Sequence, residues 1–502
     1  MVLSMCLTVF AAESSGTGTP AKGTSEDKGT ITVKGVEEES NNNIRVTAYP
    51  IVTAKYDASG FAGYDNLYGI NKITAPTVEE LSDIASRNLT GGILLAKQSD
   101  GSYVKADMSV GMYLICVTGT EAHFYNVAVA SINYVNKDGD YVITPGEVTM
   151  VKDGAAWVKK TDKPNVTKKI LKSATKTDDG LGGTANIGDE ITYEVSINPI
   201  PNYQGKFPKF EVVDTLDAGL TFVEGSLKVT VEKKTLQEKE DYTVDTSTNN
   251  VINVKFVVDD KYMLNDYTGK NAVITYKVKV NKEAAVNENS NKNSVVLNYT
   301  KDSKTDGNDT STPESKTYTY TFEIDGSVNG RGIVTKIGED KDKDALEGAV
   351  FGLYTDAECK TLYENTVFKG TAMSDKDGQI HMKGLAKGTY YLKEISAPTG
   401  YSVNNKTYTV VIDTTHNDKD GTLKTWTVTI DGKTAASFEI ENGRVTNKDS
   451  AVSGAEIKNT KLNDLPSTGG MGTYLFTITG VMIMAAVTGM FLVSRRKEHE
   501  NQ

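Results

Sequence analysis

The chain has 502 residues, enough for about three or four domains of roughly 150 residues each. Its 55 lysine and arginine residues against 66 aspartate and glutamate residues give a net charge of −11, which argues against a nucleic-acid-binding protein, because such proteins present a basic face. Four histidines spread over the whole length leave little material for histidine-based catalysis or a zinc site, so we expect no metal and no cofactor.

The N-terminal residues 1–12, MVLSMCLTVFAA, resemble the apolar core and cleavage site of a secretory signal peptide. A basic segment before this core is missing, so the true start of the signal stays open. The small and polar run 13–29 is typical of a linker. The three cysteines, Cys6, Cys116 and Cys359, lie too far apart to make a disulfide framework, so an exported protein of this kind needs another form of reinforcement.

Residues 30–160 form the first predicted domain. The segment 77–89, TVEELSDIASRNL, is the one clear helical pattern: Thr77 can cap it, Glu80 follows three residues later, and an apolar stripe includes Leu81 and Ile84. We interpret this helix as an insert in a β-rich domain. In the early run TITVKGV, Lys34 falls on the polar face of the strand.

Residues 161–325 form the second predicted domain. Runs such as EITYEVSI and VITYKVKV alternate with period two between Gly/Asn/Asp turns, which indicates a β-sandwich. The same alternation places Lys168 rather than Lys169 on the apolar face of its strand, and it favours Asp214 over Glu211. Asn293 likewise falls on the apolar face of NKNSVVLNYT.

Residues 326–462 form the third predicted domain, and it contains a distinctive motif. The stretch YYLKEISAPTGY resembles the E-box, YxLxExxAPxGY, of the collagen-adhesin B-type domain. The box is filled by Tyr390, Leu392, Glu394, Ala397, Pro398, Gly400 and Tyr401. In this family a lysine on the first strand and an asparagine on the last strand accompany the box, and these map to Lys336 and Asn459.

The resemblance implies a spontaneous amide bond between the Lys336 amine and the Asn459 side chain, with loss of ammonia. The residue types fit this chemistry, because burial disfavours charge and would leave a neutral lysine amine and a protonated Glu394. Such a glutamic acid can polarise the asparagine carbonyl and move protons. Placing the three groups together makes the reaction intramolecular.

The second domain is similar to the middle domain of Gram-positive major pilins, which carries a Lys–Asp–Asn triad. The segments NVTKKILKSA, FEVVDTLDAGL and NKNSVVLNYT carry this resemblance. It implies a second amide between Lys168 and Asn293, promoted by Asp214. The first domain lacks an E-box, and the polar position of Lys34 predicts no internal amide there.

The C-terminal residues 465–502 fit a cell-wall sorting signal. The motif LPSTGG supplies Leu465, Pro466, Ser467, Thr468 and Gly469; the uncharged segment 471–493 is long enough to cross a bilayer, and RRK follows it. The resemblance implies that a sortase cleaves between Thr468 and Gly469 and transfers Thr468 to an amine. The membrane helix would then be a temporary anchor.

In pilins, the lysine that accepts this transfer ends a motif between the first and second domains. At that place the chain reads AAWVKKTDKPN, without the Tyr-Pro of the family motif. Lys160 aligns best, and Lys159 is the alternative.

We therefore expect an all-β, linear array of Ig-like and collagen-adhesin B-type sandwiches with a C-terminal transmembrane sorting helix. The predicted function is that of a backbone pilin, secreted, polymerised covalently by a sortase and anchored to peptidoglycan at a Gram-positive surface. Its expected partners are the sortase, other pilin subunits, peptidoglycan and host surface ligands, but no nucleic acid, and the membrane only before sorting. A monomeric wall-anchored adhesin and an ancillary pilin are the alternatives, and an enzyme is not expected.

Overall fold

The computed structural model describes residues 23–40, 43–136, 140–142, 148–202, 209–259, 261–300, 309–324, 327–328, 331–339 and 344–462. The expected signal peptide 1–12, most of the linker 13–29, the LPSTGG motif and the apolar segment 471–493 lie outside these residues. Within the described ranges, no helix has the length and apolar character needed to cross a membrane.

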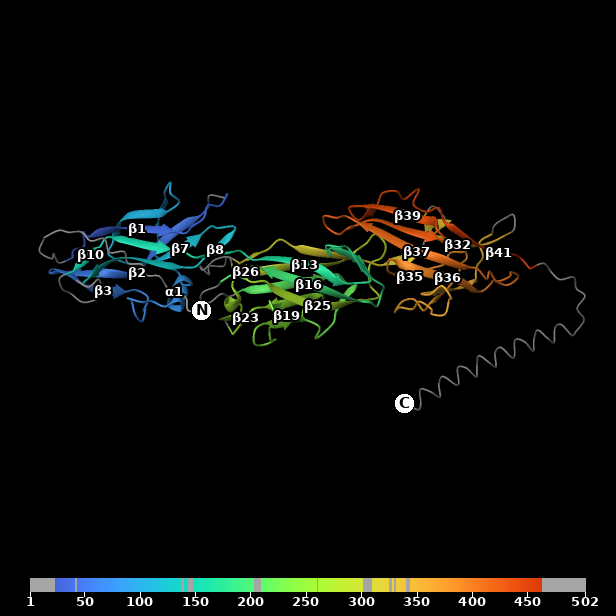
Figure 1. The fold of residues 1–502 in the computed structure, drawn as a ribbon, viewed down its shortest axis with the longest axis horizontal. Coiled ribbons are helices and arrows are strands. Elements are labelled where there is room, and N and C mark those ends of the chain that lie inside the picture. Colours follow the sequence, from blue (N-terminus) through green and yellow to red (C-terminus); the bar gives the residue numbers. More distant parts are fainter. Residues whose placement is uncertain are drawn as a thin grey trace, which may run out of the picture.

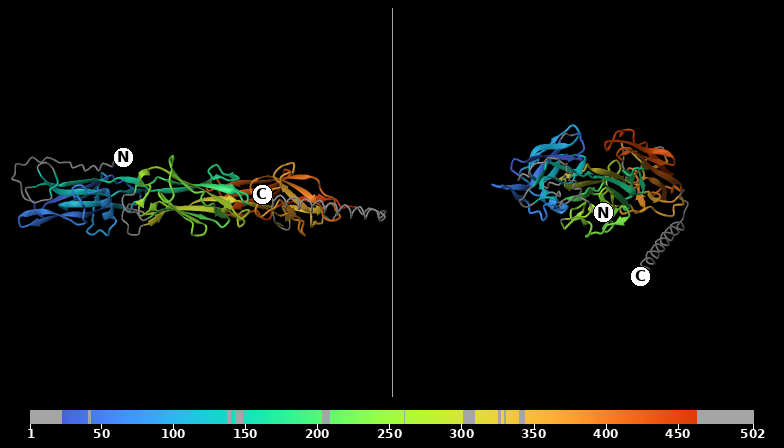
Figure 2. Two further views of the ribbon diagram at one scale, coloured as in Figure 1. Left: turned by 90° about the horizontal axis from the view of Figure 1, so that it is seen from below. Right: turned by 60° about the vertical axis from the view of Figure 1, so that its left-hand side comes forward.

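Three β-rich units follow one another along an elongated molecule (Figure 1). The same end-to-end order of blue, green and orange units is visible when the molecule is turned (Figure 2). Each unit encloses its own hydrophobic core. The predicted fold class, a linear array of β-sandwiches, is therefore confirmed.

The first unit contains two main sheets, in the orders β11-β1-β6-β5 and β10-β9-β7-β2-β3, with β4 beside β2 and a separate β12-β8 pair. The elements are β1 (Lys28–Lys34), β2 (Arg45–Asp57), β3 (Gly60–Asn66), α1 (Val78–Ala85), β4 (Ile93–Leu94), β5 (Ala96–Lys97), β6 (Tyr103–Ser109), β7 (Gly111–Thr118), β8 (His123–Tyr125), β9 (Ala128–Val135), β10 (Thr149–Val151), β11 (Asp153–Trp157) and β12 (Lys160–Asp162). The early strand β1 and the late strand β11 pair in parallel, so the chain enters and leaves the main sheet in the same direction.

The predicted helical insert is present as α1, and it is shorter than the pattern 77–89 suggested. Thr77 caps it, and Glu80 completes the capping box. The helix ends at Ala85, with Ser86 as its C-cap, while Leu89 lies beyond the helix and is still buried. The apolar stripe thus marks the buried surface correctly but runs past the end of the helix.

The second unit is a sandwich of two sheets, in the orders β13-β16-β25-β19-β20 with β18 on β25, and β14-β15-β28-β26-β17-β22-β21 with β27 on β26. Its elements are β13 (Asn165–Lys172), β14 (Thr175–Lys176), β15 (Gly182–Thr184), β16 (Glu190–Asn198), β17 (Phe210–Leu216), β18 (Leu220–Phe222), β19 (Lys228–Val231), β20 (Lys234–Thr235), β21 (Thr243–Asp245), β22 (Val251–Lys255), β23 (Val257–Val258), β24 (Lys261–Tyr262), the short η1 (Asn265–Tyr267), β25 (Ala272–Val280), β26 (Asn291–Thr300), β27 (Asp309–Ser311) and β28 (Ser315–Tyr320). Alternate residues of β16 and β25 are buried, as the period-two pattern predicts.

The third unit is built on a sheet in the order β34-β33-β36-β37-β38-β39-β40, faced by the pairs β32-β41 and β29-β35. Its elements are β29 (Phe322–Ile324), β30 (Ser327–Val328), β31 (Arg331–Gly332), β32 (Val334–Gly338), β33 (Val350–Tyr354), β34 (Thr371–Met373), β35 (Met382–Leu385), β36 (Gly388–Ser396), β37 (Thr407–His416), β38 (Leu423–Ile430), β39 (Lys433–Glu441), β40 (Arg444–Val445) and β41 (Ala455–Asn459). The strands β32 and β41 pair in parallel, which repeats the arrangement of β1 and β11 in the first unit.

The change from the second to the third unit falls earlier than the expected boundary after residue 325. Phe322 and Ile324 in β29 pair with β35, and their side chains belong to the core of the third unit. Local alternation cannot reveal this, because a strand of the same pattern can join either neighbouring core. The chain therefore leaves the second unit near residue 321.

The joint between the second and third units is closely packed. The side-chain oxygen of Asn186 accepts hydrogen bonds from the Tyr363 hydroxyl (3.0 Å), the Ala386 backbone N–H (2.9 Å) and the Tyr390 hydroxyl (3.3 Å). Tyr390 is the first residue of the E-box, so this motif contributes to the joint as well as to its own domain.

Candidate functional site: two buried lysine clusters and an exposed lysine

The first cluster lies in the third unit, where three strands bring Lys336, Glu394 and Asn459 together. Lys336 is on β32 opposite Ile457 of β41, and Asn459 follows two residues later on the same strand face. Glu394 reaches the pair from β36 in the large sheet. All three side chains are buried, Lys336 completely. The E-box thus positions its glutamate over the first and last strands of the domain.

The contacts of this cluster form a closed set. The Lys336 amine donates a hydrogen bond to Asn459 Oδ1, and Asn459 Nδ2 donates to Glu394 Oε1 at 2.8 Å. The same Oε1 lies 3.6 Å from the lysine nitrogen. The second oxygen of Glu394 accepts from the Asn404 backbone N–H at 2.6 Å, which fixes the carboxyl group. The glutamate therefore contacts the amide nitrogen of Asn459, and not its carbonyl oxygen as the sequence analysis expected.

The surroundings of Lys336 weaken its charge. Burial lowers the pKa of Lys336 to about 8, although the nearby Glu394 carboxylate acts in the opposite direction. The ring of Phe351 lies 5.8 Å from the amine nitrogen and adds to the apolar setting. Near neutral pH, the fraction of this amine in its neutral, nucleophilic form is therefore far larger than for an ordinary exposed lysine.

The second cluster lies between the two sheets of the second unit. Lys168 points inward from β13 in one sheet, while Asp214 and Asn293 point inward from the neighbouring strands β17 and β26 of the other. All three are buried. Lys169 faces outward and pairs with Glu194 at 2.8 Å. The strand-face reasoning therefore placed each of these side chains on the correct side.

Tyr276 connects this second cluster, and sequence reasoning did not assign it a role. Its hydroxyl donates to Asp214 Oδ2 at 2.7 Å and accepts from Asn293 Nδ2 at 2.9 Å. The Lys168 amine donates to both the Asp214 carboxylate and the Tyr276 hydroxyl. The alternation of VITYKVKV marks Tyr276 as a core residue, but only the cross-sheet packing shows what its hydroxyl contacts.

Both ionisable groups of the second cluster are driven toward neutrality. Burial lowers the pKa of Lys168 and raises the pKa of Asp214, each against the attraction of the other. The rings of Tyr193 and Tyr276 lie 4.9 and 4.8 Å from the lysine nitrogen. Asp214 Oδ1 and Asn293 Oδ1 are buried without a hydrogen-bond partner among the described residues. A buried polar atom without a partner is costly, so these two oxygens distinguish the cluster from an ordinary hydrophobic core.

The first unit contains no comparable cluster among its described residues. Lys34 is exposed, as predicted, with its amine 5.9 Å from the Trp157 ring. Lys160 is the first residue of β12, and its amine lies 2.6 Å from Glu37 Oε2. Lys159 is exposed, and the described part of the chain gives its side chain no ion pair. The residues of the sorting motif, Leu465 to Gly469, fall outside the described ranges.

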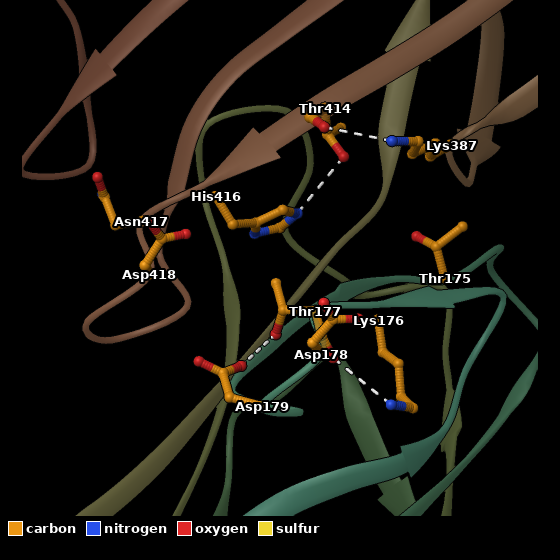
Figure 3. Close-up of a pocket in the computed structure, with 10 residues that line it drawn as sticks. All are labelled: Thr175, Lys176, Thr177, Asp178, Asp179, Lys387, Thr414, His416, Asn417 and Asp418. Carbon is orange, nitrogen blue, oxygen red and sulfur yellow. Dashed lines mark hydrogen bonds between the residues drawn. The ribbon is translucent and has the colours of Figure 1, made fainter.

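A polar cavity of about 440 Å³ lies where loops of the second and third units meet (Figure 3). Its lining includes Asp178, Asp179, Lys387, His416 and Asp418. It shares no residue with either lysine cluster. Its polar walls are unlike the largely apolar pockets that hold small molecules, so it offers no support for an enzyme active site.

Models of three known families match parts of the second unit, the third unit and the C-terminal segment. The model of the Sgo0707 N2 domain matches residues 171–313, the model of the prealbumin-like fold domain SpaA matches residues 330–427, and the model of the LPXTG cell wall anchor motif matches residues 457–500. These ranges include Asp214 and Asn293, Lys336 and Glu394, and the LPSTGG motif, respectively.

Whole-chain relatives extend this likeness to nearly the full length. The trypsin-resistant surface T6 protein of Streptococcus pyogenes serotype M6 is 26% identical over 561 residues, which cover 98% of this chain and 99% of that protein. The solved T6 backbone pilin of the same serotype, described as a modular three-domain structure, superposes with a TM-score of 0.57 at 21% identity, over 88% of this chain and 100% of that one. The full-length major pilin SpaD from Corynebacterium diphtheriae gives a TM-score of 0.49 at 19% identity, over 88% and 98% of the two chains.

Proposed function

Because the chain is a Gram-positive backbone pilin subunit with an LPXTG cell-wall anchor, we propose that its two buried lysine clusters form Lys–Asn amide bonds that reinforce the pilus shaft. The subunit is a structural protein of the cell surface. It is processed by a sortase, polymerises with other pilin subunits and becomes attached to peptidoglycan.

The observation that carries the proposal is the contact set around Lys336. Its neutral amine attacks Cγ of Asn459, so that a bond from Nζ to Cγ forms and the bond from Cγ to Nδ2 breaks. Glu394 Oε1 lies beside both nitrogens, so it can take a proton from the lysine amine and deliver it to the departing ammonia. Burial holds the three groups in one arrangement, so the reaction is intramolecular and needs no collision between separate molecules.

The second cluster performs the same exchange between Lys168 and Asn293, with Asp214 as the acid. Here the Tyr276 hydroxyl lies between the acid and the asparagine nitrogen, so we assign it the relay of the proton. Neither bond needs a cofactor or an added reagent, because ammonia is the only product released.

Intact-protein mass spectrometry tests this proposal. The mature chain should be lighter than its sequence mass by two ammonia molecules. After the mass change of the substitution itself is subtracted, Lys336→Ala should lack one of these losses and Lys168→Ala should lack the other. Lys169→Ala is the matched control, because Lys169 lies next to Lys168 but faces outward. A wild-type mass without any deficit would refute both bonds.

For assembly, we assign cleavage to the bond between Thr468 and Gly469 and the acceptor amine to Lys160, with Lys159 as the alternative. The ion pair of Lys160 with Glu37 supports the choice of Lys160, because it holds the amine in a defined place. We also propose that the assembled fibre contacts host surface ligands.

The monomeric adhesin is the rival interpretation, and a blot of wall extracts separates the two. A backbone pilin gives a ladder of high-mass polymers that disappears in Lys160→Arg and persists in Lys159→Arg. A ladder that persists in Lys160→Arg but is lost in Lys159→Arg would move the linkage to Lys159. The absence of any ladder from the wild type, in cells that contain a pilus-type sortase, would favour the adhesin.

A further inference from the structure

Lys160 is surrounded by more charged and hydrogen-bonding side chains than a solvated linker lysine requires. The strand β12 pairs with β8 so that Lys160 lies opposite Tyr125 and Asp162 lies opposite His123. Because residues two apart on a strand share a face, these four side chains lie on one face of the β12-β8 pair, with Tyr125 buried and Lys160 exposed. His123 Nδ1 contacts Asp162 Oδ1 at 2.9 Å.

Glu37, from the segment that follows β1, completes this group. Its Oε2 lies 2.6 Å from the Lys160 amine and 3.3 Å from His123 Nε2. Its backbone N–H donates to the Tyr125 hydroxyl at 2.9 Å. Two residues further on, the Glu39 carboxylate accepts from the Ala122 backbone N–H at 3.0 Å, just before β8. Glu37 is therefore tied to β8 through Tyr125 and His123, and its carboxylate is held beside the Lys160 amine.

We propose that Glu37 is the proton acceptor and positioning residue for Lys160 in the sortase transfer. The inference rests on the proposed function of Lys160 as the acceptor amine. Both internal clusters pair a lysine amine with a carboxyl group and an asparagine carbonyl carbon. Lys160 and Glu37 supply the first two parts at the surface, and the third part, the Thr468 carbonyl carbon, arrives on another subunit.

The Lys160–Glu37 pair is hydrated in the free subunit and loses this water during the transfer. In water, the hydrogen bond with Glu37 raises the pKa of Lys160, and the pair is charged. Asp162 and Tyr125 act on Lys160 in the same direction, and the pKa of Glu37 is lowered chiefly by Lys160, with a smaller contribution from His123. When the enzyme that carries Thr468 covers the site, water leaves and the charged pair loses its hydration. A neutral amine beside a neutral carboxyl group is then favoured.

The transfer removes two protons from the Lys160 ammonium group. One proton of the Lys160 ammonium passes to Glu37, and the free amine attacks the Thr468 carbonyl carbon, which the sortase holds as an activated ester or thioester. The bond from Nζ to the carbonyl carbon forms, the bond from that carbon to the enzyme breaks, and the second proton goes to the departing enzyme nucleophile. Glu37 afterwards releases its proton to water.

Kinetics of sortase transfer test the role of Glu37. The full chain in detergent serves as the acceptor, a fluorescent peptide that ends in LPSTGG serves as the donor, and conjugation at Lys160 is quantified by peptide mass spectrometry. We expect Glu37→Gln to lower kcat on the order of 100-fold, as the loss of a proton acceptor does, and Glu37→Asp to recover part of this. Glu38→Gln is the matched control, because Glu38 lies in the same segment but pairs with Lys97. Thermal unfolding of each variant checks that the fold is retained.

A second measurement separates proton transfer from structural support. A small amine-reactive ester, which needs no enzyme and removes no water from the site, should label Lys160 faster in Glu37→Gln than in the wild type below pH 10, because the amine is no longer held in its charged form. Opposite changes in the two assays support the proposal. Unchanged kcat in Glu37→Gln would overturn it, as would an equal loss in Glu38→Gln. Failure of the underlying function looks different: transfer would then continue undiminished in Lys160→Arg.

Discussion

At the scale of single residues, the two clusters use the same parts with different connections. In the third unit, Glu394 contacts the Asn459 nitrogen directly. In the second unit, Asp214 reaches the nitrogen of Asn293 only through the Tyr276 hydroxyl. The shorter aspartate side chain accounts for the difference, because the tyrosine fills the gap that a glutamate would span.

This difference predicts that removal of one hydroxyl group blocks only one bond. Tyr276→Phe should slow or prevent the amide in the second unit, because the proton path from Lys168 to the leaving nitrogen is interrupted. The measurement is intact mass against time after refolding, in which the variant should lack one of the two ammonia losses.

Tyr193→Phe is the matched control, because Tyr193 stacks on Tyr276 at 5.7 Å and its hydroxyl lies 3.2 Å from the Thr319 hydroxyl. If Tyr276→Phe loses both ammonia molecules as quickly as the wild type, Tyr276 has no part in the chemistry.

At the scale of elements, strand alternation was sufficient to orient the reactive side chains. The buried pattern of β13 places Lys168 inside and Lys169 outside, and β17 does the same for Asp214. These assignments need only the period of two, which is a local property of the chain.

Alternation could not identify which inward groups meet, because that depends on how two sheets pack. Tyr276 was for this reason seen only as a core residue. Likewise, Glu37 stands in a run of three glutamates, and nothing in the local sequence distinguishes it from Glu38 or Glu39. In the structure, Glu37 contacts Lys160, Glu38 contacts Lys97 and Glu39 contacts the Ala122 backbone. The pairing of β29 with β35, which moves the domain boundary, is also a long-range property.

At the scale of the whole molecule, the joint between the second and third units should behave as a stiff connection. Asn186 gathers three donors from the third unit, and Gly182 and Gly421 bring the two backbones so close that a Cβ on Gly182 would lie 2.2 Å from the Gly421 carbonyl oxygen. Contact this close leaves no room for a side chain at either glycine.

Asn186→Ala should therefore loosen the joint while both units stay folded. The alanine leaves the Ala386 N–H without its acceptor. The two tyrosine hydroxyls keep only their bonds within the third unit, to the carbonyl oxygens of Gly384 and Ala386. Because these bonds across the joint are lost, the two units should sample a wider range of angles. Small-angle X-ray scattering measures this as a broader distribution of particle dimensions.

Asn281→Ala is the comparison variant, since the hydrogen bonds described for the Asn281 side chain stay within the second unit, to Ala218, Thr221 and Glu283. An identical scattering curve for Asn186→Ala and the wild type would show that packing alone holds the joint.

The position of Asn293 on β26 has a consequence for elasticity. In the third unit, an amide from β32 to β41 would carry a pull across the domain through covalent bonds. In the second unit the chain continues beyond Asn293 through β27 and β28, and β28 is held by its pairing with β26 and β15. A strong pull could strip β28 from its sheet, yet the amide would stop the rest from unravelling. Each subunit would thus lengthen by the extension of β28 and shorten again when the pull ends. The rest of the second unit would not extend.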